Sequence, residues 1–477
     1  MPAALATIVF ALLILALFRL DRDRTTKVSA TLWIPIVWVL IGASRMVSQW
    51  LGSGPTLVSP DQYLDGSPLD RVIFSGLILS GLLVVLSRGQ RSGAFLRSNG
   101  PLLALFIYGG VSILWSDFPE VAFKRWIKFL GNFIMVLVVL TDPNPSAAVK
   151  SLLARTGFLL IPLSVLLIKY YPELGRSYDP WTYKPFFNGV AAGKNSLGII
   201  CLIFGLGSLW RVLEAFKSAE KPWLSGPLIA HGAILIMVLW LFGMANSSTS
   251  TGCFLVGMGL LLLTSLRRKP LSPMAIHLIL AGIVSVALFG LFIDANAGLI
   301  EVMGREATLA GRTELWEELL RMNNHPWFGS GFESFWLGEQ AKDLWEHHWW
   351  HPNQAHNGYI EILLNQGWIG IGLFAVVFAW GYRNALNSLH ADGSQGRIRL
   401  AYFVIVVLYS LTEAAFKSIN PIWVIFLLAI VVLPKDVDGS AETLEYDGNF
   451  HGAQPNERTH ETAEVFREAG YLHPPPG

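Results

Sequence analysis

Long runs of apolar residues, separated by short polar segments, fill the chain from residue 2 to residue 434. A transmembrane helix needs about 20 mostly apolar residues to cross a hydrocarbon core of roughly 30 Å. The pattern predicts an all-α polytopic membrane protein with about 12–13 transmembrane helices, the shortest of which could be half-spans. The ranges are 2–18, 31–50, 70–87, 101–115, 126–141, 150–168, 192–210, 226–243, 251–266, 274–293, 358–381, 399–414 and 419–434.

Two segments lack this pattern. Residues 294–357 are polar and aromatic, and they are predicted to form one large external loop with short helices, within a transmembrane domain of residues 1–434. Residues 435–477 hold nine acidic and three basic residues and end in Pro-Pro-Pro before the last glycine. Such a segment cannot bury enough apolar surface to offset its ordering entropy, so it is predicted to be a disordered acidic cytoplasmic tail.

Basic residues recur in alternate loops of this pattern. Lys and Arg favour the cytoplasmic side of short loops, so these loops are assigned to that side, the N-terminus outside and the C-terminus inside. The first span is then an anchor rather than a cleaved signal peptide. The basic residues are Arg19, Arg22, Arg24, Lys27, Arg88, Arg91, Arg97, Lys150, Arg155, Arg211, Lys217, Lys221, Arg267, Arg268, Lys269, Arg383, Arg397 and Arg399.

Composition agrees with a membrane protein. Charged residues make up 14% and hydrophobic residues 53% of the chain, whereas about 25% are charged in an ordinary soluble domain. The formal net charge of +1 excludes a bulk nucleic-acid binder. Removing the tail's −6 leaves +7 on residues 1–434, so the acidic tail conceals a cationic membrane domain.

The external loop concentrates aromatic and imidazole side chains. It holds six of the 18 Trp and five of the 11 His. An interfacial aromatic belt is the simpler explanation for single Trp residues. A belt needs no His, however, and flat aromatic faces beside hydrogen-bonding groups suit sugar rings. The residues are Trp316, Trp327, Trp336, Trp345, Trp349, Trp350, His325, His347, His348, His351 and His356.

Within and after this loop, residues 311–321 predict an amphipathic helix with Arg312 and Trp316 on one face. Residues 326–332 predict a turn whose glycines permit positive φ and close backbone approach. His356 and Asn357 then open a span in which Gly367 and Gly370 are expected to permit close helix contact.

These motifs occur in a fixed order: G-R-T-x-x-W at 311–316, H-P-x-x-G-x-G-F at 325–332, H-N-x-Y at 356–359 and G-x-x-G at 367–370. The set resembles the O-antigen ligase and polysaccharide polymerase superfamily, and within it the ExoQ-like exopolysaccharide production proteins. The segments 114–120 and 193–198 also fit, so the resemblance covers roughly residues 100–375. In one departure, residues 246–252 form a Ser/Thr-rich segment without the Arg that many members carry there.

The resemblance implies a metal-independent glycosyltransferase of the bacterial inner membrane, needing no cofactor. It would transfer glycan from an undecaprenyl-diphosphate-linked oligosaccharide donor to a hydroxyl of a glycan or lipid-linked acceptor, on the periplasmic side. Similarity to the exopolysaccharide subgroup favours a polymerase of exopolysaccharide or O-antigen repeat units over an O-antigen ligase acting on lipid A core. A polysaccharide or lipid exporter and a membrane scaffold are the alternatives from other classes.

Three residues are predicted to be catalytic. Arg312 matches the family's Arg and suits phosphate, because its fork stays charged and donates bidentately. Lys194 lies in the first turn of a span, where a cation is costly and N–H groups favour anions. His356 matches the family's His and suits a base for the acceptor hydroxyl. The competing interpretations are a surface ion pair, a snorkelling lysine and a capping histidine.

Further residues are predicted to contact substrate, namely Asn195, Asn357, Trp316, Arg125 and Lys124. Lys124, Arg125 and Lys128 are cations on the predicted outer side, where lipid headgroups are an equal alternative as their partner. His347 and His351 would share a helix face, but no H-E-x-x-H pattern is present and Pro352 ends the run. A metal site is therefore not predicted.

Overall fold

The computed structural model describes residues 1–23, 26–53, 66–178, 183–218, 225–266, 271–295, 310–348, 350–391 and 393–432. The elements of the first part are α1 (Ala3–Leu20), η1 (Ala30–Leu32), α2 (Trp33–Ala43), α3 (Val47–Trp50), α5 (Pro68–Ser87), α6 (Gly89–Ser98), α7 (Gly100–Val111), η2 (Ser112–Trp115), α8 (Pro119–Leu140), α9 (Pro145–Tyr170) and α10 (Pro172–Gly175). The second part has β1 (Arg176–Tyr178), β2 (Pro185–Phe187), α11 (Lys194–Ser218), α12 (Gly226–Ala245), α13 (Ser248–Leu266), α14 (Pro273–Ala295), α15 (Ala310–Arg321), α16 (Gly338–His347), α17 (Gly358–Ala391), α18 (Gly393–Tyr409) and α19 (Pro421–Ile430).

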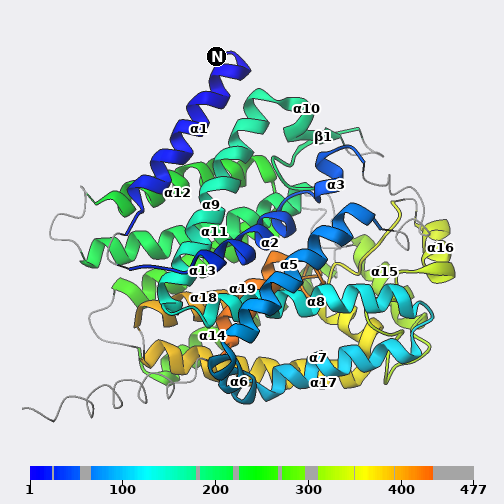
Figure 1. Cartoon of the computed structure of the whole chain (residues 1–477). Helices are drawn as coiled ribbons and strands as arrows, with labels where there is room; N and C mark the ends of the chain where they lie inside the picture. Colours follow the sequence, from blue (N-terminus) through cyan, green and yellow to red (C-terminus); the bar gives the residue numbers. More distant parts are fainter. Residues whose placement is uncertain are drawn as a thin grey trace, which may run out of the picture. The chain divides into compact units, whose positions relative to one another are not determined.

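The described fold is all-α, as predicted, apart from one short antiparallel pair of β1 and β2. The long helices run roughly side by side across the bundle (Figure 1). The chain packs α11 against α12, α17 against α18, and α13 against both α11 and α18. The predicted acidic tail of residues 435–477 lies outside the described residues.

Each of the thirteen predicted spans falls on a helix, but they are not equal in length. Among the described residues, eight helices are long and apolar enough to cross a membrane: α1, α5, α9, α11, α12, α13, α14 and α17. A ninth is present if α6 and α7, bent by 83°, count as one span. The shorter helices α2 and α19 are apolar and buried, which lets them pack inside the bundle without reaching both surfaces. The predicted count of 12–13 spans therefore exceeds the eight or nine described helices that are long and apolar enough to cross a membrane.

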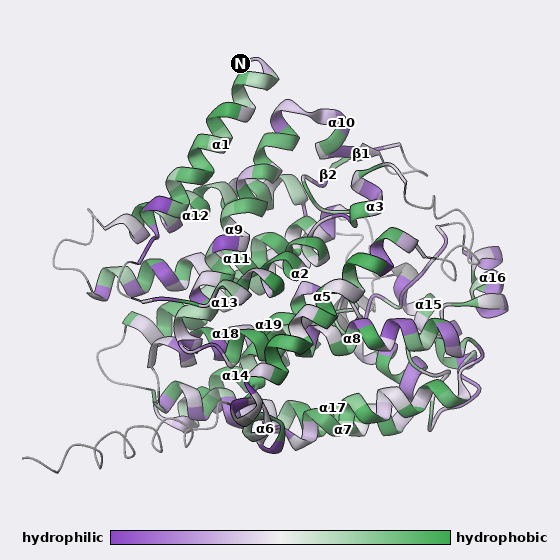
Figure 2. Cartoon of the chain, in the orientation of Figure 1, coloured by the Kyte–Doolittle hydropathy of each residue, from purple (hydrophilic) through white to green (hydrophobic). Residues whose placement is uncertain are grey.

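The outer faces of several helices carry exposed large apolar side chains. Leu12 on α1, Val72 and Leu83 on α5, and Val286 on α14 are 60%, 71%, 69% and 72% exposed. Apolar residues cover the middle of the bundle in Figure 2, and polar ones gather towards its ends. A soluble protein does not expose so many large apolar side chains over so many helices, so these faces fit contact with lipid tails.

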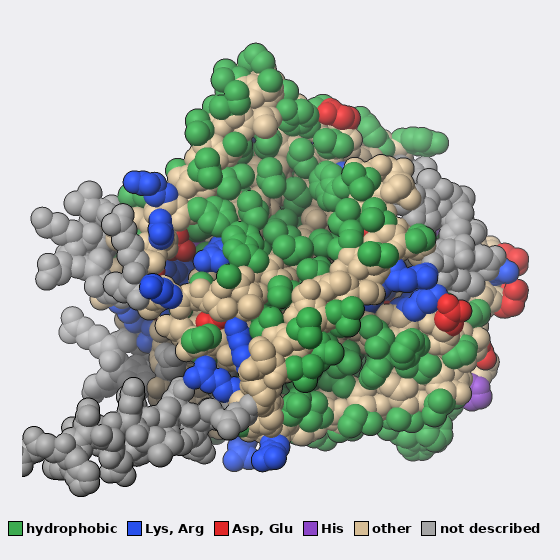
Figure 3. Space-filling view, in the orientation of Figure 1, with side chains coloured by type: hydrophobic (Ala, Val, Ile, Leu, Met, Phe, Trp, Pro, Cys, Tyr) green, Lys and Arg blue, Asp and Glu red, His purple; other side chains and the backbone are tan. Residues whose placement is uncertain are grey.

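Charged residues gather at two opposite ends of the helices. At one, here called the basic end, Arg211 contacts Asp21 at 3.2 Å, Lys150 contacts Glu214 at 2.6 Å, and Arg88 lies 3.7 Å from Asp142. These residues come from loops that were predicted to share one side of the membrane, and the structure does bring them together. Lys and Arg also stand out at this end in Figure 3, with apolar surface between them and a second group. The opposite end, here called the site end, holds the external-loop helices α15 and α16.

Candidate active site

A buried carboxylate joins several predicted site residues at the site end. Glu413, just after α18, is 7% exposed. It accepts a hydrogen bond from Asn195 Nδ2 at 3.1 Å, and its Oε2 lies 3.3 Å from His356 Nδ1. Its Oε1 is 3.8 Å from Arg312 Nη2. Residues from four distant chain segments therefore meet at one carboxylate.

The helix α15 fixes the position of Arg312. Arg312 Nη1 donates to the Thr412 carbonyl oxygen at 2.9 Å. One turn later, Trp316 Nε1 donates to the Ala355 carbonyl oxygen at 2.7 Å. Arg312 and Trp316 therefore share one face of α15, as predicted. The indole N–H of Trp316 holds the loop before His356. Trp316 also packs against a buried apolar cluster that includes Leu315, Leu319, Leu344 and Leu364.

His356 sits at a tight turn immediately before α17. Its φ is +49°, in the left-handed region that non-glycine residues rarely adopt. Asn357 stabilises the turn, because its Oδ1 accepts hydrogen bonds from the Tyr359 and Ile360 N–H groups at 2.9 and 3.1 Å. Asn357 Nδ2 donates to the Leu411 carbonyl oxygen at 3.1 Å. Asn357 is thus a helix cap that ties His356 to the segment after α18, and its predicted contact with substrate stays a prediction.

A cavity of about 860 Å³, here called the outer groove, opens beside Glu413. Its polar end is lined by Lys194, Asn195, Arg312, Thr412 and Glu413, together with residues 246–249. Its remaining walls are largely apolar, with Val256 from α13 and Ile279, Ile283 and Val286 from α14. The groove therefore matches an amphiphile with an anionic head and a hydrocarbon tail.

Hydroxyl groups line the groove at residues 247–249. Thr249 Oγ1 and Thr412 Oγ1 are 2.9 Å apart, and Ser247 Oγ donates to Ser250 Oγ at 3.1 Å. Asn246 ends α12 in the left-handed conformation, which turns the chain directly into α13. This Ser/Thr-rich segment supplies hydrogen-bonding groups to the groove but no fixed charge.

Lys194 is the first residue of α11, within the first turn where it was predicted, and its side chain is exposed at the groove. Within the described parts of the chain, no hydrogen-bond or ion-pair partner of its ammonium group is found. Lys194 and Arg312 therefore place two cations at the polar end of one cavity, with Glu413 between the elements that carry them.

The structure does not bring Arg125 and Lys124 into the groove. Both lie on α8, which begins at Pro119 rather than at the predicted residue 126. Arg125 donates to the carbonyl oxygen of Glu333 and lines a second cavity. Lys124 pairs with Glu120 on an exposed surface. The two outer cations thus differ, one facing a cavity and one facing solvent or lipid headgroups.

Three histidines of the external loop have structural partners. His347 Nδ1 and His348 Nε2 lie 3.0 and 2.7 Å from the two carboxylate oxygens of Glu318. His351 stacks on Trp345, with ring centroids 4.5 Å apart. These contacts tie α16 and its following loop to α15. Trp349, named with them above, lies outside the described residues.

The turn at residues 326–332 has the predicted glycine geometry, with φ of +69° at Gly329 and +90° at Gly331. Its backbone bonds directly to α17, since Ser330 N donates to Leu364 O at 2.9 Å and Trp368 N donates to Pro326 O at 2.8 Å. Gly367 does permit a close approach, but of the turn at residues 326–332 rather than of another helix. Gly367 breaks α17 at φ +64°, and a Cβ there would lie 2.3 Å from the backbone of Trp327.

Glu413 was missed by sequence reasoning, although a signal existed. It falls within the predicted span 399–414. An ionisable residue inside a span is costly unless it is paired, and it is a functional candidate by default. The same rule was used to select Lys194, and it would have identified Glu413 as well.

Comparison with known proteins bears on this site. Residues 232–375 match the family model of O-antigen ligase. The predicted resemblance is confirmed. The chain is also similar to the exopolysaccharide production protein ExoQ of Rhizobium meliloti (strain 1021), with 24% identity over 302 residues. That match spans 61% of this chain and 66% of the relative. The region matched to the family model runs from α12 into α17, so it contains Arg312 and His356 and excludes Lys194 and Glu413.

Proposed function

We propose that the protein is a membrane glycosyltransferase that moves glycan from an undecaprenyl-diphosphate carrier to a sugar hydroxyl, at the periplasmic face of a bacterial inner membrane. One observation carries the proposal. A groove with cations at one end and apolar walls along its length lies directly beside the Glu413–His356 pair. Similarity to the O-antigen ligase family and to ExoQ supports the same reaction class.

The outer groove suits the donor lipid. Ile279, Ile283 and Val286 would contact the polyprenyl chain, while Lys194 and Arg312 would contact the diphosphate. Negative charge accumulates on the diphosphate as the glycosidic bond breaks, so fixed cations stabilise the transition state more than the ground state. Arg312 is well suited because the hydrogen bond from its Nη1 to the Thr412 carbonyl oxygen holds the guanidinium in place. Asn195 and the hydroxyls of residues 247–249 add donors that carry no net charge.

His356 would act as the base. In the step proposed, the acceptor hydroxyl oxygen forms a bond to the anomeric carbon of the donor sugar. The bond from that carbon to the diphosphate oxygen breaks, and undecaprenyl diphosphate leaves with the electron pair. The hydroxyl proton moves to His356 Nε2, because Nδ1 faces the Glu413 carboxylate at 3.3 Å. Glu413 orients the imidazole and stabilises the imidazolium that forms.

Polymerisation of repeat units is the favoured form of this reaction, because the curated relative is an exopolysaccharide production protein. Ligation to lipid A core uses the same donor with a different acceptor and is the alternative within the class. An exporter would place its charged residues near the bilayer midplane. Here Lys194 and Arg312 lie at one end of their helices, which favours the enzyme.

A deletion strain with glycan analysis tests this proposal. Loss of polymerisation leaves single repeat units on carrier lipid or lipid A core, and loss of ligation leaves long carrier-linked chains. We expect the His356→Ala gene to restore neither product at normal membrane abundance. His347→Ala is the matched control, because that imidazole is 68% exposed in the same loop. Unchanged glycans in the deletion strain would reject both reactions.

A further inference from the structure

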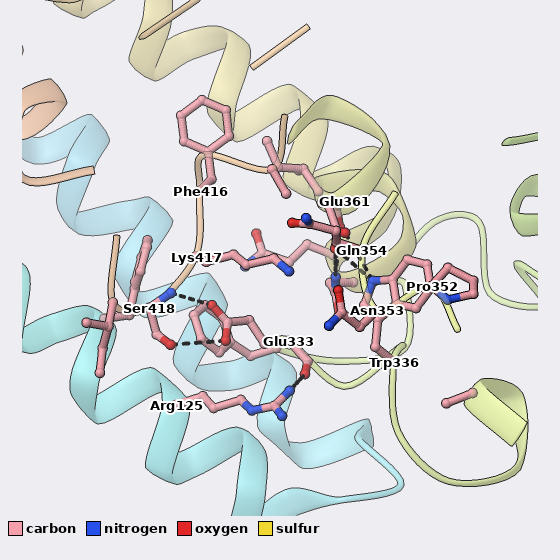
Figure 4. A pocket seen from close by; sticks show the side chains of 18 of the residues that line it. Arg125, Glu333, Trp336, Pro352, Asn353, Gln354, Glu361, Phe416, Lys417 and Ser418 are labelled. Atoms are coloured by element: carbon pink, nitrogen blue, oxygen red, sulfur yellow. Dashed lines mark hydrogen bonds between the residues drawn. The ribbon is translucent and has the colours of Figure 1, made fainter. Parts of the chain in front are cut away.

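A second cavity lies behind the loop that carries His356. It measures about 380 Å³ and is lined by α8, α16, α17 and the segment after α18. Figure 4 shows Arg125, Glu333, Trp336, Gln354 and Lys417 around it. Pockets for small organic ligands span about 300–1,000 Å³, so this cavity is large enough for a compact polar ligand. Nothing in the proposed donor contacts uses it.

The outer groove and this second cavity are lined by consecutive parts of the segment after α18. Thr412 and Glu413 line the groove, and Lys417 lines the second cavity five residues after Thr412. His356 joins the two sides, because its Nδ1 lies 3.3 Å from Glu413 Oε2 and 3.5 Å from Gln354 Nε2. Gln354 lines the second cavity. The candidate base therefore contacts one residue from each cavity.

The two carboxylates at the second cavity are held by the protein itself. Glu333 accepts hydrogen bonds from the Ser418 N–H at 2.6 Å and from Ser418 Oγ at 3.1 Å. Glu361 accepts from Trp336 Nε1 at 3.0 and 3.1 Å and from the Ala355 N–H at 2.6 Å. These bonds use the carboxylates to fix the walls of the cavity, so other groups are left to contact a ligand.

One polar group of this cavity, the Lys417 ammonium, is available to a ligand. The Lys417 side chain extends into the cavity in Figure 4, and the described residues offer it no hydrogen-bond or ion-pair partner. A donor of three N–H groups at a cavity suits a ligand with several oxygen atoms.

We propose that the second cavity is the acceptor pocket, and that it binds the sugar whose hydroxyl attacks the donor. Lys417 would donate to oxygen atoms of that sugar. The proposal rests on the proposed glycosyltransferase function, and it adds a second substrate site next to the loop that carries His356. Lys417 is then a substrate-binding residue, with no part in holding the donor diphosphate.

Binding by the purified full chain tests this assignment. The two probes are undecaprenyl diphosphate and the repeat-unit oligosaccharide released by mild acid from the strain's carrier lipid. Because a charge-assisted hydrogen bond is lost, Lys417→Met should raise the Kd for the oligosaccharide about tenfold or more. The Kd for undecaprenyl diphosphate should stay within about twofold. Lys417→Arg should recover most of the affinity, which a purely structural role would not predict.

Lys342→Met is the matched control, since Lys342 is an exposed residue of α16 that pairs with Glu339. Oligosaccharide affinity equal in Lys417→Met and Lys342→Met would overturn the acceptor pocket. A similar loss for both probes would also overturn it, because it would indicate a general structural change. Failure of the wild-type protein to bind undecaprenyl diphosphate would instead count against the proposed function, so the two failures are distinguishable.

Discussion

The two charged ends of the bundle use their ions differently. At the basic end the carboxylates are paired with cations across helices. Asp21 lies 3.2 Å from both Arg211 and His231, and Glu214 contacts Lys150 at 2.6 Å as well as Arg211. Such a network joins α1, α9, α11 and α12. Its charges are satisfied within the protein, which is the pattern of a structural element.

At the site end, two lysines lack, within the described chain, the carboxylate partners that the cations of the basic-end network have. Glu413 is shared among Asn195, Arg312 and His356. Lys194 and Lys417 line cavities, and the described residues give neither a carboxylate partner. A cation at a cavity without a counter-ion is available to an anionic or oxygen-rich ligand. The comparison sets a carboxylate network that is closed within the protein against a shared carboxylate and two lysines that line cavities.

Among the substitutions that compare the two ends, the largest effect should come from Arg312→Ala. Losing a charged donor at the leaving diphosphate should lower the transfer rate by about 10²–10³-fold while abundance is kept. Arg321→Ala is the control on the same helix, because Arg321 is 81% exposed and pairs only with Glu317 among the described residues. Rates measured per folded molecule should separate the two variants. Equal transfer rates for Arg312→Ala and Arg321→Ala would contradict a catalytic role for the cation at the cavity.

Glu413→Gln should have the next largest effect. The amide keeps the shape of the side chain but lacks the charge that stabilises protonated His356, so we expect a fall of about 10–100-fold in transfer. The KM for the acceptor should change little, because the contact with Gln354 remains. A normal transfer rate for this variant would show that the carboxylate is only structural, like those at the basic end.

Arg211→Met addresses the opposite end. It leaves Asp21 and Glu214 with fewer partners. We expect the free energy of unfolding to fall by about 1–2 kcal/mol, which would lower membrane abundance several-fold. Transfer per folded molecule should stay near that of the wild type. Lys217→Met is the control, because Lys217 is exposed in the last turn of the same helix. A catalytic defect in Arg211→Met at full abundance would contradict the structural role of this network.

The smallest effect concerns the contact of α15 with α16. Burial raises the pKa of Glu318, but hydrogen bonds from His348 and His347 outweigh it, and the net pKa lies below its usual 4.5. A lowered carboxyl pKa contributes stability above pH 4.5, and this is lost as the pH falls further. Because Glu318 is 30% exposed, the contribution is small. The Tm difference between wild type and Glu318→Gln should therefore be small at pH 7 and vanish in acid; a difference that grows would contradict it.

The sequence predicted the helices well, because hydropathy is a local property. The place of Lys194 in the first turn of a helix, the helix of Arg312 and the turn at residues 326–332 were all predicted from neighbouring residues. The meeting of these residues at Glu413 could not be found in this way. Glu413 lies 100 residues or more from Arg312 and Asn195 along the chain, and only packing brings them together.

The roles of individual polar residues were harder to predict. Asn357 caps α17, and Trp316 holds a loop carbonyl, because backbone groups at helix ends need partners that a sequence does not reveal. Lys124 and Arg125 are adjacent in sequence, yet only Arg125 lines a cavity. Their difference depends on which side of α8 each side chain leaves, and that is set by the neighbouring loop at Glu333.

Transfer by purified protein in lipid nanodiscs tests the central claim most directly. The donor would be the strain's carrier-linked repeat unit, and the readouts would be extended glycan and released undecaprenyl diphosphate. We expect the wild type to form both in equal amounts, and His356→Ala to bind undecaprenyl diphosphate normally while forming neither. Full transfer by His356→Ala would contradict the account, because the acceptor hydroxyl would then lose its proton without the proposed base.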